Sequence, residues 1–227
     1  MGCWLARTKK AHASQKALSV ATTEASSHSL QAWSCNSRVQ VKYSLHMFNS
    51  LLFMLACATS LFAQPPQESD YTIPFPPHRI VANVYYVGSK GLASYLITTP
   101  EGHILINSSF ESSVPLIREA IENLRFRFSD VKILLISHAH SDHNAGSALV
   151  KELTGAKYMV MDGDVPDVQA GGKGNFQYGK SPDTFYKPTV VDRVLHDGDE
   201  VRLGDVVLVA HLTPGHTKGC TTWTMRQ

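Results

Sequence analysis

Short runs of apolar residues, separated by polar turns that contain Gly or Pro, recur from residue 80 onward and predict a series of short strands. Two runs rich in β-branched and aromatic residues, 80–87 and 92–98, flank a Gly-containing turn and predict a β-hairpin. Residues 131–136 form a nearly continuous apolar run, which is typical of a strand covered on both faces. Further strands are expected at 103–106, 156–161, 201–203, 206–212 and 221–225.

Helical periodicity is confined to two segments. Apolar residues three or four positions apart, with Pro115 in the first turn, predict one helix: Val114, Ile117, Ile121, Leu124 and Phe128. Residues 144–153 predict a second helix, ended by Gly155. Residues 162–190 are rich in Gly, Asp, Pro and Lys and are expected to form a long loop with one helical turn near Val165. Long loops within a domain often cover a functional site.

The N-terminal region has a different character. Residues 1–46 are rich in Ser, Ala, Thr and Lys, and we expect them to lie upstream of the mature protein. Residues 47–63 have an apolar core that ends in small residues and predict a signal peptide cleaved after Ala63. The proline-rich segment 64–79 is expected to be an extended arm, and 80–227 the folded domain. An ordinary buried helix at 47–63 is the alternative.

Charge and composition narrow the classes of function. Hydrophobic residues make up 43% of the chain and charged residues 18%, which excludes disorder throughout. Residues 47–227 hold fifteen basic and eighteen acidic residues, a formal charge of −3, so nucleic acid is not expected as a partner. No run of eighteen apolar residues is present. Together with the predicted signal peptide, this leads us to expect a periplasmic or secreted protein, monomeric and without stable membrane association after signal cleavage.

A dense cluster of potential metal ligands follows the buried strand at 131–136. His138, His140, Asp142 and His143 lie within six residues, a pattern expected by chance in about one such chain in a thousand. Imidazole and carboxylate are the usual zinc ligands of hydrolytic sites. Alternate residues of an extended loop can direct His138 and His140 at one ion, while Asp142 and His143 serve a neighbouring ion. A histidine cluster without a metal is the alternative.

A second turn supplies a candidate for the third nitrogen ligand. His216 lies in the sequence Thr213-Pro-Gly-His-Thr217, between two predicted strands. A lone histidine is a weak signal, but the upstream pair lacks a third nitrogen, so His216 is predicted as a ligand. Elsewhere, His211 is expected to pack within a strand, and His103 and His196 to lie at the surface.

These motifs resemble the metallo-β-lactamase superfamily. The superfamily motif His-x-His-x-Asp-His matches residues 138–143 in full, and its later Pro-Gly-His matches 214–216. Similarity to the third subclass of zinc β-lactamases runs through 91–97, 154–157, 197–200 and 217–223. The resemblance implies an α/β fold, the αββα sandwich, with a zinc site at one edge of the sheets.

The resemblance also implies the chemistry. His138, His140 and His216 would hold one Zn²⁺, and Asp142 and His143 the second, together with one further histidine. A hydroxide held between the two ions would attack the β-lactam carbonyl of a small-molecule antibiotic, with Asp142 orienting it as the catalytic residue. Phe176 and Tyr178, in the long loop, are possible contacts of the substrate or simple anchors of the loop.

Two departures from the superfamily pattern stand out. No histidine follows His216, and we expect the C-terminal part of the fold, with the sixth ligand, to be missing from this chain. Asn107 stands where the superfamily commonly has Asp, which is expected to weaken support for the ligands without removing one.

Other readings remain open. The ligand cluster also fits a thioesterase or lactonase of the same superfamily, or an inactive zinc-binding fragment. Ser129-Asp-Val-Lys132 matches the Ser-x-x-Lys motif of serine β-lactamases, but it leads into a strand and no Lys-Thr-Gly follows. The serine mechanism is therefore not favoured.

Overall fold

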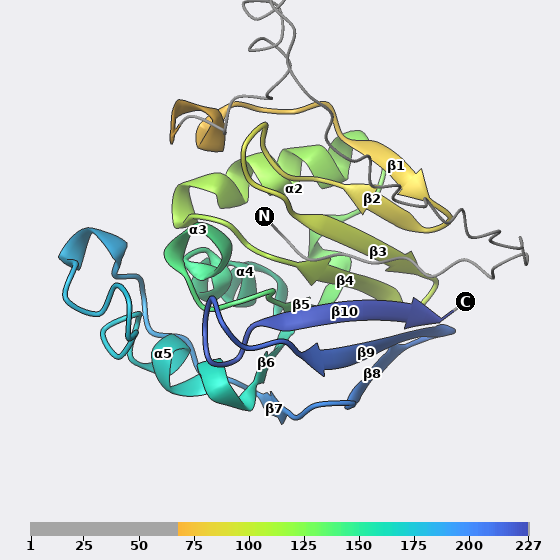
Figure 1. Cartoon of the computed structure of the whole chain (residues 1–227). Helices are drawn as coiled ribbons and strands as arrows, with labels where there is room; N and C mark the ends of the chain where they lie inside the picture. The colour runs from red at the N-terminus through yellow and green to blue at the C-terminus, as the bar shows by residue number, and fades with distance from the viewer. Residues whose placement is uncertain (1–67, 227) are drawn as a thin grey trace, which may run out of the picture. The chain divides into compact units, whose positions relative to one another are not determined.

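The computed structural model describes residues 68–226, in which two β-sheets lie face to face and helices cover one of them (Figure 1). The predicted upstream extension and signal peptide lie outside the described residues. None of the helices within the described range is long and apolar enough to cross a membrane.

The larger sheet has seven strands in the order β1-β2-β3-β4-β5-β6-β7. The pairs from β1 to β4 are antiparallel, whereas β4, β5, β6 and β7 run parallel. The carboxyl ends of β4, β5 and β6 therefore meet at one edge of the sheet. The strand bounds are β1 His78–Val81, β2 Val84–Tyr86, β3 Tyr95–Thr99, β4 Gly102–Ile106, β5 Val131–Leu135, β6 Lys157–Met161 and β7 Arg193–Leu195.

Side chains alternate between the two faces of this sheet because successive residues of a strand point in opposite directions. On one face, Leu96, Leu105 and Leu134 pack with Ile117 and Ile121 of a helix. The helices are α2 Val114–Asn123, α3 Ser141–Asn144, α4 Ser147–Thr154 and α5 Val165–Gln169. This face forms the first of two apolar cores.

The opposite face packs on the second sheet, which has three antiparallel strands in the order β10-β9-β8. Ile104 and Leu135 of the larger sheet meet Leu208, Ala210 and Trp223 of the smaller one. The bounds are β8 Glu200–Leu203, β9 Val206–Leu212 and β10 Thr221–Arg226. The described residues thus supply the first three layers, α, β and β, of the predicted αββα sandwich.

Most predicted elements are present, with differences at turns and short strands. The predicted strand 80–87 is wrong as one strand, because the chain turns at Ala82 (φ 46°) and splits into β1 and β2. Strand β7 was not predicted. The predicted helix 144–153 corresponds to α4, which starts at Ser147 and ends, as predicted, at Gly155 in the left-handed conformation, while the short helix α3 before it was not predicted. Within the proline-rich segment 64–79, which was expected to be extended, Glu68–Thr72 forms a 3-10 helix. Strand β1 begins at His78, near the end of that segment.

Candidate metal centre

Two loops from different sheets meet at the carboxyl edge of the larger sheet. One follows β5 and leads through His138 and His140 into α3, and the other joins β9 to β10. The backbone N–H of Thr221 donates to the Ser137 carbonyl at 2.8 Å. The indole N–H of Trp223 donates to the Ile136 carbonyl at 3.1 Å. These two hydrogen bonds hold the base of one loop against the base of the other.

The imidazoles of His138, His140 and His216 converge, and one nitrogen of each lies within 4.8 Å of the others. His140 Nδ1 is 3.1 Å from His216 Nε2. Two nitrogens bound to one tetrahedral zinc at 2.0–2.1 Å are about 3.3 Å apart, so this spacing suits two ligands of one ion. The buried Nε2 of His138 has no hydrogen-bond partner, as expected of a ligand atom.

A second group of possible ligands shares His138. His138, Asp142 and His143 also place one ligand atom each within 4.8 Å of the others. Oδ2 of Asp142 lies 3.4 Å from Nε2 of His143, and the buried Nδ1 of His143 has no hydrogen-bond partner. All five predicted ligands therefore lie together, in two overlapping groups. Their assignment to particular ions stays a prediction.

Burial and the closeness of the imidazoles to one another disfavour their protonated forms. Burial lowers the pKa of His138 to about 2, and the imidazoles of His143, His140 and His216 act in the same direction. Burial also lowers the pKa of His140 and of His143, although the carboxylate of Asp142 opposes the shift in both. Neutral imidazole is the form that binds a metal ion, so these ligands need not lose a proton to bind one near pH 7.

The residues present fit zinc. Three converging imidazoles, of which those of His138 and His140 each carry an unpartnered buried nitrogen, make a nitrogen-rich set typical of zinc in hydrolytic sites. Imidazole and carboxylate in the second group suit the same metal. The Ser137 hydroxyl lies 3.1 Å from Nδ1 of His138 and fixes the orientation of that ring, as outer partners of metal-binding histidines commonly do.

Asn107 supports the same loop from β4. Its Oδ1 accepts a hydrogen bond from the backbone N–H of Ser137 at 2.8 Å, and its Nδ2 donates to the Ala93 carbonyl. Its backbone is left-handed, with φ 67°, a conformation that Asn tolerates better than most residues. Asn107 thus positions the backbone just before His138.

The long loop reaches the cluster through two tyrosines. The ring of Tyr178 lies edge-on to that of His140, with centroids 4.9 Å apart. The hydroxyl of Tyr186 donates to the Ala139 carbonyl at 2.9 Å. A small pocket between this loop and the metal loop includes His140, Tyr178 and Tyr186 in its lining. Phe176 is 60% exposed. Tyr178 therefore borders the site directly.

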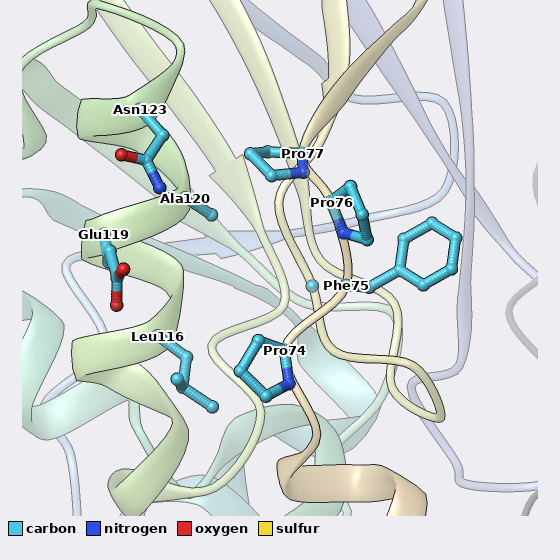
Figure 2. A pocket seen from close by; sticks show the side chains of 9 residues that line it. Pro74, Phe75, Pro76, Pro77, Leu116, Glu119, Ala120 and Asn123 are labelled. Atoms are coloured by element: carbon cyan, nitrogen blue, oxygen red, sulfur yellow. The ribbon is translucent and has the colours of Figure 1, made fainter.

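The groove in Figure 2 lies elsewhere, between Pro74–Pro77 and the Leu116 to Asn123 part of α2. None of the predicted site residues lines it. It is therefore not part of the metal centre.

Sequence reasoning missed Asp164. Its side chain is fully buried, and its two oxygens accept hydrogen bonds from both metal loops. Burial raises its pKa, while the hydrogen bonds from Gly219, Thr217 and Ala139 oppose that shift. Its position right after β6, at the same sheet edge as β5, is the one signal in the sequence that could have indicated it.

Three further histidines between residues 68 and 226 do not belong to the cluster. His103 was predicted at the surface, but it is buried, and its ring packs edge-on against Phe126. His196 is exposed, as expected, and pairs with Asp162. His211 lies within β9, and its Nε2 is 2.8 Å from the Thr224 hydroxyl.

Comparison with known proteins identifies the class. Residues 91–226 match the family described as the metallo-beta-lactamase superfamily, and the chain belongs to it. A curated protein of Burkholderia pseudomallei (strain 1710b), described as a probable metallo-hydrolase, is 32% identical over 98 residues, which are 43% of this chain and 32% of that protein.

Among solved structures, the chain resembles native FEZ-1 metallo-beta-lactamase from Legionella gormanii, with 58% identity and a TM-score of 0.67 over 72% of this chain and 60% of that one. It also resembles BJP-1, a subclass B3 metallo-beta-lactamase of Bradyrhizobium japonicum, with 40% identity and a TM-score of 0.65 over 69% and 58%. The fold and the subclass resemblance expected from the sequence are thus confirmed. The chain spans about three fifths of the length of these structures.

Proposed function

We propose that this protein hydrolyses the β-lactam ring of antibiotics with two zinc ions. The observation that carries the proposal is the convergence of three imidazoles and of a second group with one carboxylate at one edge of the sandwich. Similarity to proteins described as metallo-beta-lactamases supports the substrate class.

In this proposal the two groups of ligands have separate roles. His138, His140 and His216 would hold one zinc, and Asp142 and His143 would contribute to holding the second. Bound zinc supplies Lewis acidity and lowers the pKa of a coordinated water to about 7, which makes a nucleophile available at neutral pH. The carboxylate of Asp142, whose side chain is 34% exposed, would accept a hydrogen bond from a water at the site and so orient it.

The long loop provides a wall for the substrate. The Tyr178 ring lies against His140, so a lactam bound at the metal centre would contact its exposed edge. Phe176, in the same loop, offers an exposed apolar surface. Both residues are proposed to contact the substituents of the lactam, not the reacting atoms.

Hydrolysis of a chromogenic cephalosporin by the zinc-loaded full chain tests the proposal. We expect turnover that a chelator abolishes and added zinc restores. His216→Ala should remove it, whereas the matched control His196→Ala, at an exposed histidine paired with Asp162, should not. Turnover of thioesters or lactones without lactam turnover would refute the substrate class, and zinc binding without any turnover would indicate an inactive chain.

Export is part of the same proposal. The predicted signal peptide at 47–63 would send the protein to the periplasm or outside the cell. Sequencing of the N-terminus of the exported protein should find Gln64 first. A retained leader would refute this part alone.

A further inference from the structure

The carboxylate of Asp164 links two loops that supply different ligands. Its Oδ2 accepts the backbone N–H of Ala139, at 2.9 Å, and the hydroxyl of Thr217, at 2.8 Å. Its Oδ1 accepts the backbone N–H of Gly219, at 2.7 Å. Ala139 stands between His138 and His140, and Thr217 directly follows His216. One side chain therefore connects the backbone on both sides of the three-histidine group.

The surroundings of Asp164 are closely packed. A Cβ atom on Gly219 would lie 2.4 Å from the Asp164 backbone nitrogen. A Cβ on Gly163 would lie 2.5 Å from the Lys218 carbonyl oxygen. These approaches are possible only without side chains at both positions, so the turn after β6 and the loop after His216 are held in direct backbone contact.

We propose that Asp164 is a positioning residue that sets the zinc affinity of the three-histidine site. The group His138, His140 and His216 combines ligands of two loops, and its geometry depends on how those loops are held together. The group His138, Asp142 and His143 comes from a single loop and does not need that link. Asp164 should therefore control the first site selectively.

The chemistry of the carboxylate suits this role. Three donors converge on Asp164, and two are backbone N–H groups whose positions are fixed by the chain. Hydrogen bonds to a charged acceptor are stronger than those between neutral groups. The amide of Asn has one oxygen and one NH₂ group, so Asp164→Asn must lose at least one of the three bonds and place a donor against a donor.

This inference rests on the proposed zinc site, and its test uses zinc binding instead of turnover. Zinc affinity of the full chain is measured by competition with a chromophoric chelator. Asp164→Asn should weaken zinc binding at the three-histidine site about 10- to 100-fold, as is typical when an outer partner of a metal ligand is lost. Zinc affinity at the other site should change less than threefold. The Co²⁺-loaded variant should also show a changed visible spectrum.

Matched variants separate positioning from a general loss of structure. Asp162→Asn makes the same chemical change in the same turn, at an exposed side chain paired with His196, and should bind zinc as the unchanged protein does. Thr217→Val removes one hydrogen bond to Asp164 at nearly the same side-chain volume, and should weaken zinc binding at the three-histidine site severalfold. Thr217→Ser retains the hydroxyl and should restore the affinity.

The outcomes are distinguishable. If the unchanged chain binds no zinc, the proposed function and this inference both fail. Suppose instead that the unchanged chain binds zinc. If the zinc affinities of Thr217→Val and of folded Asp164→Asn then lie within twofold of that of Asp162→Asn, only the role of Asp164 is refuted. An equal loss of affinity at both sites would also refute it, because that result indicates a general structural effect. Should Asp164→Asn not fold, the Thr217 pair decides.

Discussion

Trp223 joins the smaller sheet to the start of the metal loop, and Trp223→Phe tests how much that link stabilises the domain. The indole is 2% exposed and packs in the core between the two sheets. Its N–H donates to the carbonyl of Ile136, the last residue before the loop that carries His138. Phe retains a ring of similar shape but has no donor.

Two effects contribute to the expected fall in the free energy of unfolding of Trp223→Phe. The Ile136 carbonyl loses this donor in a buried position, which costs about 1–3 kcal/mol. The smaller ring leaves unfilled space in the core. Because removing a whole aromatic side chain costs 3–5 kcal/mol, removing part of one costs about 1 kcal/mol. We therefore expect the free energy of unfolding to fall by about 2–4 kcal/mol.

Urea unfolding followed by far-UV circular dichroism measures this loss, with the metal removed from both proteins. Tyr178→Phe is the control, because it also removes a polar group from an aromatic ring but does so at a hydroxyl hydrogen-bonded to Gln177 at the surface. Its effect should stay below about 0.5 kcal/mol. A loss below 1 kcal/mol for Trp223→Phe would show that the contact between the sheets does not depend on the indole hydrogen bond.

Three further predictions concern single positions. Gly219→Ala should cost about 1–3 kcal/mol, since the new Cβ overlaps the Asp164 backbone; thermal unfolding within 2 °C of the unchanged protein would contradict this. Asn107→Ala should unfold more easily than Asn107→Gly by about 1 kcal/mol in urea, because Ala is strained at φ 67° and Gly is not; equal values would contradict this. Burial lowers the pKa of His103 below that of the unfolded chain, so its contribution to stability is present above pH 6.5 and is lost as the pH falls below that value. The free energy of unfolding, measured in urea, should therefore fall less between pH 7.5 and pH 5.5 for His103→Gln than for the unchanged protein. An equal fall in both proteins would contradict the effect of burial on His103.

The sequence predicts much of this fold because its signals are local. The apolar run 131–136 becomes β5, and the helical spacing around Ile117 places α2 on the sheet. Short or turn-dependent elements were harder. Arg193–Leu195 is too short to show a period, and the turn at Ala82 uses a positive φ at a residue that rarely adopts one.

The residues of the candidate site likewise fall into those that a local pattern predicts and those that it does not. The ligands stand in compact motifs, so their residue types and spacing predict the chemistry. Asp164 and Tyr186 depend on the packing of segments far apart in the chain, which no local pattern shows. The burial of His103 has the same origin, since Phe126, which covers it, lies after α2.

Diffraction at the zinc absorption edge, from crystals of the full chain grown with zinc, tests the central claim most directly. We expect an anomalous peak about 2.0–2.1 Å from one ring nitrogen of each of His138, His140 and His216. A folded domain with no peak among these three imidazoles, or with zinc held only by surface groups such as His196, would contradict it.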